Sequence, residues 1–294
     1  MKVLVTGAHG KVGQATVTAL QASGHEVTAC DVARPVFDTP EPGAPRYQQA
    51  DLTDSGQAYA VVRGHHAVVH SAAIPEPTQN PPHVVFGNNL MSTFNVLEAA
   101  VRFGVTRFVN LSSETVPGFF FPERDFLPSY VPVDEAHPIA PQDPYALAKH
   151  FGEQLCDAAV RRSDIRCTSI RPSWVQTPDN YARNLGPLLR DRSKLTPSLW
   201  AYIDVLDLAD ALVLAVQGDL VGHEVFYIAS PDNVGGRDFA AALREHYGEA
   251  IELRPLERVD ESGISSAKAQ RLLGWNPKRS WRDHLDDHGN PLAR

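Results

Sequence analysis

Short apolar runs alternate with longer segments whose apolar positions recur three and four residues apart, through most of the chain up to residue 170. Continuously apolar runs are typical of strands that helices cover on both faces, and the longer periodic segments are typical of helices. The predicted strands are Lys2–Thr6, Glu26–Cys30, Arg46–Gln49, Ala67–His70, Arg107–Leu111 and Arg166–Ile170. The predicted helices are Val12–Ala22, Ser55–Arg63, Pro82–Phe103 and Pro144–Arg162. This order predicts an α/β fold with a doubly wound parallel sheet.

The same alternation continues beyond residue 170, with a predicted helix at Val205–Gln217 and a predicted strand at Glu224–Ala229. We therefore expect residues 1–170 to form the core, with residues 199–230 returning to it. Residues 171–198 and 231–294 are expected to form a small C-terminal substrate-binding subdomain. The segment from Pro117 to Pro144 is rich in proline and aromatic residues, which predicts an ordered loop that packs over another part of the molecule.

Composition and charge exclude several classes of protein. The chain has 294 residues and a net charge of 27 − 35 = −8, which is not the electrostatic footprint of a nucleic-acid-binding protein. No apolar run approaches the roughly 20 residues that span a membrane, and the N-terminal apolar run is too short for a signal peptide. Three cysteines without metal spacing predict no disulfide framework. A cytoplasmic protein with no membrane or nucleic-acid partner is expected.

A glycine-rich turn links the first predicted strand to the first predicted helix. Gly7 allows a tight turn, Gly10 lets the backbone approach a pyrophosphate, and Gly13 allows close packing of helix and strand. The helix N-terminus then offers N–H groups and a positive dipole end to the phosphates. Strand, turn and helix in this order predict a Rossmann dinucleotide-binding site. The turn residues expected to contact the cofactor are Gly7, His9, Gly10, Lys11, Val12 and Gly13.

Acidic residues follow the next two predicted strands. Asp31 stands where a carboxylate would bind the adenosine ribose hydroxyls and repel a 2′-phosphate. We therefore expect NAD rather than NADP, although Arg34 lies near enough to weaken that preference. Asp51 and Leu52 end the third strand, where the adenine would lie, but such a pair often only caps a helix.

Tyr145 and Lys149 stand four residues apart, so a helix places them on one face. An unperturbed tyrosine, with a pKa near ~10, is a poor base at neutral pH. A lysine ammonium beside it, with a positive nicotinamide ring nearby, favours the phenolate. Tyr145 can then exchange a proton with a carbinol while hydride passes to or from the cofactor.

With these motifs in place, the sequence resembles the extended short-chain dehydrogenases/reductases, and within them the NAD-dependent epimerase/dehydratase group. The resemblance covers nearly the whole chain. It rests on TGAHGKVG, Asp31, Asp51-Leu52, HSAA at 70–73, NNLMSTFNVLEAA at 88–100, NLSS at 110–113, YALAK at 145–149, SIRPS at 169–173, YIDVLDLADA at 202–211 and KAQRLLGWNP at 268–277.

The resemblance implies roles for individual residues. Ser113 would hydrogen-bond the reacting oxygen alongside Tyr145, and Lys149 would also orient the nicotinamide ribose. Further expected cofactor contacts are His70, Ser71, Ala72, Ala73, Asn89, Leu111, Pro172 and Ser173. Ser112 is expected to be a satisfied strand-end hydroxyl, and Asn88 and Asn95 can equally be polar residues that pack their helix.

Departures from the family pattern narrow the activity. The 4,6-dehydratases carry an Asp-Glu pair after the catalytic hydroxyl, and Glu114-Thr115 stands there in this chain, so dehydratase activity is not expected. Nucleotide-sugar epimerases place a diphosphate-binding arginine where this chain has Trp200. Two segments, SSETVPGFF and LWAYID, are more like the uronate dehydrogenases. In that comparison Arg183 corresponds to the arginine that binds the substrate carboxylate, but it can equally be a solvated surface residue.

The likeness to uronate dehydrogenases is incomplete, because those proteins have Asn-His where this chain has Glu114-Thr115. A carboxylate there would repel an acidic substrate unless it is turned away or protonated. The expected substrate contacts are Ser113, Glu114, Thr115, Ser173 and Arg183. No metal site is expected: Asp204, Asp207 and Asp210 share a helical face but are better explained as solvated or capping carboxylates. His65, His66 and His137 are expected at the surface.

Three functions remain open at this point. The first is an NAD-dependent dehydrogenase, or a carbonyl reductase in the reverse direction, acting on a sugar, sugar acid or similar polyhydroxy compound. The second is a nucleotide-sugar 4-epimerase that keeps NAD tightly bound. The third is a non-catalytic NAD(P)-sensing protein, which would not need Ser113, Tyr145 and Lys149 together. The resemblance also implies a homodimer formed through the helices at residues 82–103 and 144–162.

Overall fold

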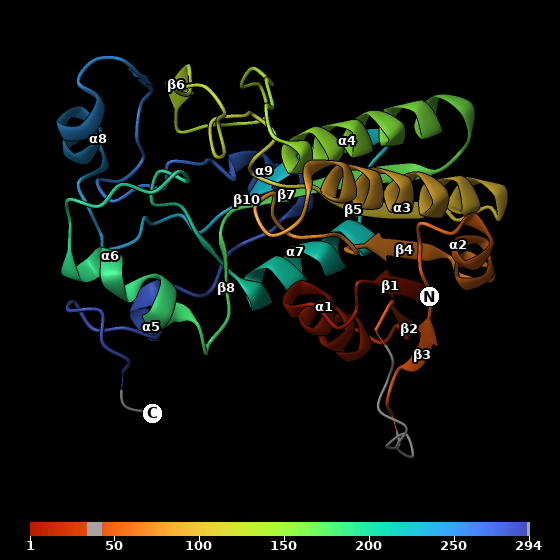
Figure 1. The fold of residues 1–294 in the computed structure, drawn as a ribbon. Coiled ribbons are helices and arrows are strands. Elements are labelled where there is room, and N and C mark those ends of the chain that lie inside the picture. The colour runs from red at the N-terminus through yellow and green to blue at the C-terminus, as the bar shows by residue number, and fades with distance from the viewer. Residues whose placement is uncertain (34–42, 293–294) are drawn as a thin grey trace. The chain divides into compact units, whose positions relative to one another are not determined.

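The computed structural model describes residues 1–33 and 43–292 (Figure 1). The described residues form two compact units. The first unit comprises residues within Met1–Ser112, Asp143–Ile170 and Ala209–Val225. The second unit comprises Ser113–Gln142, Arg171–Leu208 and the described residues from Phe226 onward. Residues 113–142, which include most of the proline- and aromatic-rich segment and are called the aromatic loop below, group with the second unit. The sequence analysis places them within residues 1–170. The assignment of a substrate-binding role to the second unit stays a prediction.

A seven-stranded sheet is the central element of the fold. Its strands are β1 (Lys2–Thr6), β2 (Glu26–Asp31), β3 (Arg46–Gln49), β4 (Ala67–His70), β5 (Arg107–Leu111), β7 (Arg166–Pro172) and β10 (His223–Ile228). Their order in the sheet is β10-β7-β5-β4-β1-β2-β3. Every pair from β7 to β3 is parallel. The predicted doubly wound parallel sheet is confirmed, with β2 and β7 extending slightly beyond their predicted ends.

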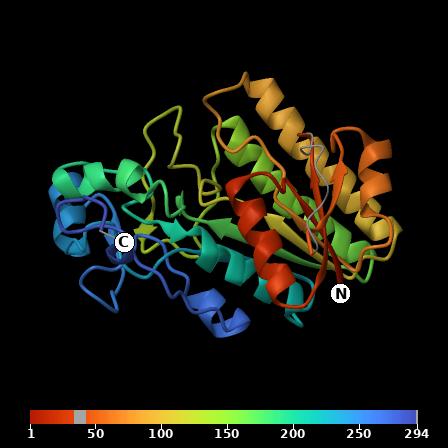
Figure 2. The same ribbon diagram turned by 90° about the horizontal axis from the view of Figure 1, so that it is seen from below.

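Helices cover both faces of this sheet. The long helices are α1 (Lys11–Ala22), α2 (Ser55–Val62), α3 (Pro82–Arg102), α4 (Pro144–Arg162) and α7 (Val205–Gln217). Helices α2, α3 and α4 lie on one face, and α1 and α7 lie on the other (Figures 1 and 2). Two sheet faces covered by helices explain why β1, β4 and β5 are almost entirely buried apolar runs.

Capping residues fix where two of these helices begin. The Asp54 carboxylate accepts a hydrogen bond from the Gln57 N–H and caps α2. The Asp143 carboxylate accepts hydrogen bonds at 2.9 Å from the N–H groups of Tyr145 and Ala146, and Pro144 opens the first turn of α4. This N-cap and first-turn proline fix the start of α4. Tyr145 is therefore held in the first turn of a rigid helix.

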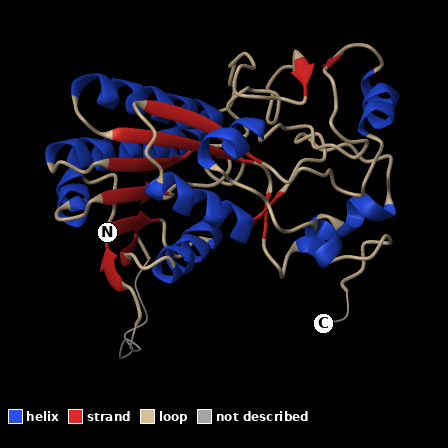
Figure 3. Cartoon of the chain, turned by 180° about the vertical axis from the view of Figure 1, so that it is seen from behind, coloured by secondary structure: helices blue, strands red, loops and turns tan. Residues whose placement is uncertain are grey.

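The second unit is built from loops and short elements (Figure 3). Its strands are β6 (Tyr130–Val131), β8 (Val175–Gln176), β9 (Ile203–Asp204) and β11 (Glu252–Leu253), which form the parallel pairs β8–β9 and β6–β11. Its helices are α5 (Tyr181–Asn184), α6 (Gly186–Arg190), α8 (Phe239–Tyr247), α9 (Ala267–Leu273) and a 3₁₀ turn at Trp281–Asp283. Strands of two residues show no alternation of apolar and polar positions, so the sequence does not predict them.

Aromatic residues form the core of the second unit. Phe119 and Phe120 of the aromatic loop are buried and stacked, with ring centroids 4.4 Å apart, and they share a core cluster with Trp200 and Trp281. The predicted packing of this loop is confirmed for these two residues. The expectation that His137 lies at the surface is wrong: its ring is buried, and its Nε2 accepts a hydrogen bond from the Ser129 N–H at 3.0 Å.

The acidic residues around the start of α7 are buried rather than solvated. Asp204 accepts hydrogen bonds from the Tyr181 hydroxyl and the Leu206 N–H, each at 2.8 Å. Asp207 accepts hydrogen bonds from the N–H groups of Lys278 and Arg279. The expectation of solvated carboxylates is therefore wrong for both, while Asp204 does cap the helix. The described residues contain no group of three or more His, Cys, Asp or Glu arranged to hold a metal ion.

Among the described helices, none combines the length and the apolar character that crossing a membrane requires.

Candidate active site

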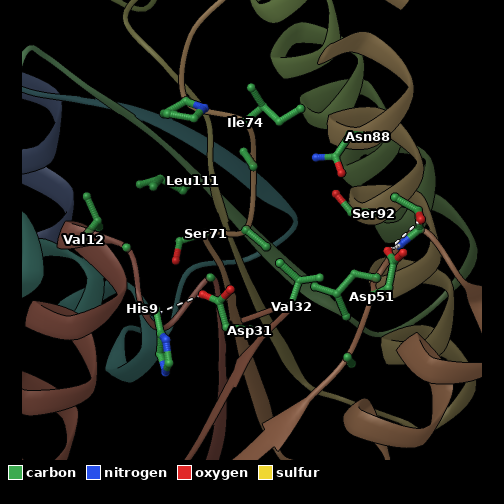
Figure 4. Close-up of a pocket in the computed structure, with 18 of the residues that line it drawn as sticks. His9, Val12, Asp31, Val32, Asp51, Ser71, Ile74, Asn88, Ser92 and Leu111 are labelled. Carbon is green, nitrogen blue, oxygen red and sulfur yellow. Dashed lines mark hydrogen bonds between the residues drawn. The ribbon is translucent and has the colours of Figure 1, made fainter. Parts of the chain in front are cut away.

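A cavity of about 750 Å³ opens at the carboxyl ends of β1, β2, β4 and β5, within the first unit (Figure 4). It lies where the order of strands reverses, because the chain continues from β1 to β2 on one side while β4 lies on the other. Open parallel sheets bind their ligands at this position. The cavity is lined by Gly7, His9, Gly10, Lys11, Val12, Asp31, Val32, Ala50, Asp51, Leu52, Thr53, Ser71, Ala72, Ala73, Ile74, Pro75, Asn88, Ser92, Leu111, Tyr145 and Lys149.

The glycine-rich turn is packed too closely for side chains. Gly7 has a φ of +66°, and a Cβ atom there would lie 2.7 Å from the Cα of Ala72. A Cβ atom on Gly13 would lie 2.1 Å from the carbonyl oxygen of Gly7. No side chain caps α1, whose N-terminus directs its N–H groups and positive dipole end toward the cavity rim. This end of the cavity suits an anionic group.

Asp31, at the end of β2, faces this turn. Its carboxylate accepts hydrogen bonds from the His9 N–H at 2.9 Å and the Ala33 N–H at 3.2 Å (Figure 4). The carboxylate therefore holds the glycine-rich turn as well as lining the cavity. Arg34, which the sequence analysis considered beside it, lies outside the described residues.

The turn after β3 is held by a side chain of α3. Asn95 is buried, and its amide donates hydrogen bonds at 3.0 Å to the carbonyl oxygens of Leu52 and Thr53. The Asp51 carboxylate accepts hydrogen bonds from the Thr53 N–H and hydroxyl, at 2.9 and 2.7 Å. Asp51 and Leu52 line the cavity, and Asn95 acts behind them as a packing residue.

The segment after β4 is fixed in the same way. The Ser71 hydroxyl donates to the Thr6 carbonyl at 2.6 Å. Asn89, buried on α3, donates to the Ile74 carbonyl at 3.0 Å and accepts from the Ile74 N–H at 2.7 Å. Both polar ends of its side chain therefore hold this loop. The His70 ring lies behind the cavity, where burial first and then Lys149 lower its pKa to about 3.

Tyr145 and Lys149 line the cavity together from one face of α4. The Lys149 Nζ lies 5.6 Å from the centroid of the Tyr145 ring and donates a 2.6 Å hydrogen bond to the carbonyl of Leu111, at the end of β5. Burial lowers the pKa of Lys149 to about 8, and the nearby Glu153 carboxylate acts in the opposite direction. The pair therefore lines the cavity beside the carboxyl end of β5.

Ser112 is a bonded strand-end hydroxyl, as expected. It donates a 2.6 Å hydrogen bond to the Oε1 of Glu153, which is buried on α4 one turn after Lys149. This bond ties the end of β5 to the helix that carries Tyr145 and Lys149.

In the second unit, Ser113 is held by its neighbour. The Ser113 Oγ accepts hydrogen bonds from the Thr115 N–H at 3.2 Å and from the Thr115 hydroxyl at 3.0 Å. A hydroxyl oxygen has two lone pairs, so Ser113 is left with its own proton to donate. That geometry suits a donor to an oxygen atom.

Glu114 and Ser173 form a buried polar pair in the second unit. The Glu114 N–H donates to the carbonyl of Pro172 at 3.2 Å, which places the residue beside the end of β7. Burial raises the pKa of Glu114 to about 8, and the Ser173 hydroxyl acts in the opposite direction. Within the described residues, neither the Glu114 Oε2 nor the Ser173 hydroxyl has a hydrogen-bond partner.

Arg183 is exposed on α5. Its Nε donates a weak 3.4 Å hydrogen bond to the Oδ1 of Asn184, and its charge contributes to the lowered pKa of the exposed Asp179 after hydrogen bonds to that carboxylate. The side chain is therefore available to an acidic ligand, as a solvated surface arginine also is.

The cavity brings together most of the residues predicted to bind a cofactor. Gly13, His70 and Asn89 lie behind its lining, while Pro172 and Ser173 belong to the second unit. The sequence analysis did not name these lining residues as cofactor contacts: Val32, Ala50, Thr53, Ile74, Pro75, Asn88 and Ser92. Most of them adjoin the predicted strand ends, and Asn88 and Ser92 are four apart on α3, which is the signal that could have identified them.

Comparison with known proteins agrees with this geometry. The family model described as "NAD dependent epimerase/dehydratase family" matches residues 3–229. A UDP-glucose 4-epimerase from Corynebacterium glutamicum is 26% identical, covering 95% of this chain and 92% of the relative. A uronate dehydrogenase from Pseudomonas syringae pv. tomato is 28% identical, covering 90% of each. The solved structure of MoeE5 in complex with UDP-glucuronic acid and NAD is 26% identical, with a TM-score of 0.71, covering 96% of this chain and 95% of that one. The chain belongs to the NAD dependent epimerase/dehydratase family.

Proposed function

We propose that this protein is an NAD-dependent oxidoreductase that moves hydride reversibly at a secondary alcohol or carbonyl of a sugar, a sugar acid or a similar polyhydroxy compound. The observation that carries the proposal is one cavity that is lined both by the glycine-rich turn and by the Tyr145–Lys149 pair. Support comes from the family and from relatives that include a uronate dehydrogenase and a UDP-glucose 4-epimerase.

The residues of the cavity fit a dinucleotide. The absence of Cβ atoms on Gly7 and Gly13 allows the turn to pack tightly, and the α1 N-terminus would bind the diphosphate. Asp31 would accept hydrogen bonds from the adenosine ribose hydroxyls and disfavour a 2′-phosphate. NAD, when bound, supplies the hydride acceptor or donor. NADP is the less favoured cofactor.

Tyr145 would carry the proton of the reacting alcohol. A lysine ammonium close to the phenol favours the phenolate, and the Leu111 carbonyl holds Lys149 in place. Lys149 would also bind the nicotinamide ribose. By the family resemblance, Ser113 would donate its remaining proton to the same substrate oxygen as Tyr145.

The 4-epimerase is the second candidate function. It would use the same hydride and proton transfers but return the hydride to the opposite face of the sugar, with no net turnover of NAD. The UDP-glucose 4-epimerases among the relatives favour it. Trp200 disfavours it, because a buried indole stands where such epimerases have their diphosphate-binding arginine. A non-catalytic NAD(P)-sensing protein is the third reading, and it gives Tyr145 and Lys149 no role.

A homodimer is also part of the proposal. Helices α3 and α4 pack together and expose four large apolar side chains: Val84, Met91, Phe94 and Phe151. Apolar side chains grouped on a helix pair are typical of a surface that another subunit covers. The proposed location is the cytoplasm, where the free thiols of Cys30, Cys156 and Cys167 would stay reduced.

The test begins with the cofactor. Purified protein is analysed for retained NAD, NAD and NADP are titrated by calorimetry, and NADH formation is followed across sugars and sugar acids. NAD that exchanges freely, with net NADH formation, supports the dehydrogenase. NAD that stays bound without net turnover supports the epimerase. If NAD does not bind, the proposed function is wrong.

A further inference from the structure

The second unit contains a buried acid whose hydrogen-bonding capacity is unused. Glu114 is 8% exposed, and its Oε2 has no hydrogen-bond partner among the described residues. Ser173 is 2% exposed, and its hydroxyl faces the Glu114 carboxyl. Buried polar groups in folded proteins are nearly always hydrogen-bonded. An unused carboxyl oxygen next to the proposed catalytic Ser113 points to a ligand that completes its hydrogen bonding.

The surroundings of Glu114 favour its uncharged form. Burial is the main cause that raises the pKa of its carboxyl, to about 8, and the Ser173 hydroxyl is the only other cause. No cation and no second carboxylate among the described residues contributes to this shift. Asp204, Asp207 and Asp232 differ, because each of these buried carboxylates lies within 4.0 Å of an arginine. An unpaired buried carboxylate is costly as an ion, so the group takes up a proton instead.

A protonated carboxyl group has an O–H to donate, whereas an ionised one can only accept. We propose that Glu114 acts as a neutral carboxylic acid that donates a hydrogen bond to an oxygen atom of the substrate. The substrate itself, a sugar or sugar acid, rests on the proposed function. Glu114 is then neither a base nor an anion, so it does not repel a sugar acid at neutral pH. Once ionised at alkaline pH, it would disfavour such a substrate by like-charge repulsion.

The protonation state can be measured without knowing the substrate. Infrared difference spectra of the full chain are recorded between wild type and Glu114→Gln, from acid to alkaline pH. The expected result is a carboxylic acid carbonyl band near neutral pH that Glu114→Gln removes and that titrates at about pH 8. Glu123→Gln is the matched control, since Glu123 is an exposed glutamate in the same loop. Absence of the band near neutral pH would overturn the proposal.

Hydrogen-bond donation is tested with glucuronate and glucose, which differ only at one carbon. For wild type, the KM for glucuronate is expected to rise as the pH passes about 8, and the KM for glucose is expected to rise less. Glu114→Gln keeps a donor, so it should weaken binding less than Glu114→Ala, for which a loss of about ten-fold is expected. Both variants should abolish the difference between the two sugars in this pH dependence, because the titration of Lys149, whose pKa is also about 8, affects both sugars alike. An equal collapse of kcat in both variants would identify a base and overturn the proposal.

These outcomes separate this proposal from the proposed function. If NAD binds and sugars are turned over while the infrared band is absent, only the role of Glu114 is wrong. If the band is present but no sugar or sugar acid of the substrate screen is bound or oxidised by wild type with NAD, the proposed function is wrong, and the substrate role of Glu114 is overturned with it.

Discussion

The cofactor cavity of the first unit and the polar residues near Ser113 in the second unit are built in different ways. The cavity is formed mainly by backbone at the ends of parallel strands, and buried amides hold that backbone: Asn89 binds Ile74, and Asn95 binds Leu52 and Thr53. Around Ser113, the polar groups are single side chains carried by loops, and their chemical role is a proposal. The difference indicates that the first region is complete before any substrate binds.

Unused hydrogen-bonding capacity differs between the cofactor cavity and the surroundings of Ser113. In the first unit, the hydroxyls of Thr6 and Ser71 and the amide of Asn89 all have protein partners. Next to Ser113 in the second unit, the Glu114 Oε2 is a buried polar atom with no partner among the described residues. A site that binds NAD in the same way for every substrate can be rigid, with its polar groups already hydrogen-bonded within the protein. A site that distinguishes one sugar from another gains specificity from groups that only the correct ligand satisfies.

The largest effect is expected from a substitution of Tyr145, the proposed proton carrier. Tyr145→Phe should lower the rate of hydride transfer by about 10²–10⁴ while leaving NAD affinity largely intact, because the proton carrier is lost and the ring still fills its place. Single-turnover rates and NAD titration measure the two properties. Tyr59→Phe, on α2, is the control. Turnover close to wild type in Tyr145→Phe would contradict the proposed mechanism.

Lys149→Ala should impair both catalysis and NAD binding. Its ammonium lies beside the Tyr145 ring and would contact the nicotinamide ribose, so kcat and NAD affinity are both expected to fall. Lys2→Ala, an exposed lysine at the start of β1, is the control. A normal NAD affinity in Lys149→Ala would show that Lys149 does not bind the cofactor and that it acts only on Tyr145.

The stability of the second unit should depend on pH through Glu114. The pKa of this carboxyl is raised in the folded protein, so between about pH 4.5 and pH 8 the unfolded chain loses a proton that the folded protein keeps. Stability therefore falls as pH rises through this window, with a slope of at most about 1.4 kcal/mol per pH unit. The free energy of unfolding of Glu114→Gln, relative to wild type, should rise from pH 5 to pH 8 and then level off. A pH-independent difference in denaturant unfolding would contradict this.

Arg183 tests whether the second unit recognises acidic substrates. Its planar guanidinium suits a carboxylate better than a lysine would. Arg183→Ala should raise the KM of a sugar acid by an amount equivalent to about 1.5–3 kcal/mol and should change the KM of a neutral sugar little. Arg271→Ala, an exposed arginine on α9, is the control. Equal kinetics for Arg183→Ala and wild type on every substrate would show that Arg183 is a solvated surface residue without a role in substrate binding.

The same contrast explains how much the sequence could predict. Apolar runs and helical spacing predict the strands and long helices closely, and the positions of Gly7, Gly13 and Asp31 predict the cavity, because all of these depend on local pattern. The short strands of the second unit have no periodicity to detect. Burial of Asp204 and Asp207 depends on partners far away in the sequence, such as Arg279, and His137 is buried within its own irregular loop, so polar residue types alone predicted the wrong exposure.

The smallest expected effect concerns the choice between NAD and NADP in the first unit. Asp31→Ala should narrow the preference for NAD by about 1–2 kcal/mol, because charged hydrogen bonds to the ribose are lost. The same carboxylate also accepts hydrogen bonds from the N–H groups of His9 and Ala33, so alanine disturbs the turn as well. Asp31→Asn separates the two effects: it removes the charge that disfavours a 2′-phosphate but keeps one acceptor for the turn. We expect Asp31→Asn to gain affinity for NADP while losing less NAD affinity than Asp31→Ala, with Glu26→Gln at the exposed start of the same strand as the control. Calorimetric titration of both cofactors measures this, and equal use of NAD and NADP by wild type would show that Asp31 does not face the 2′ position.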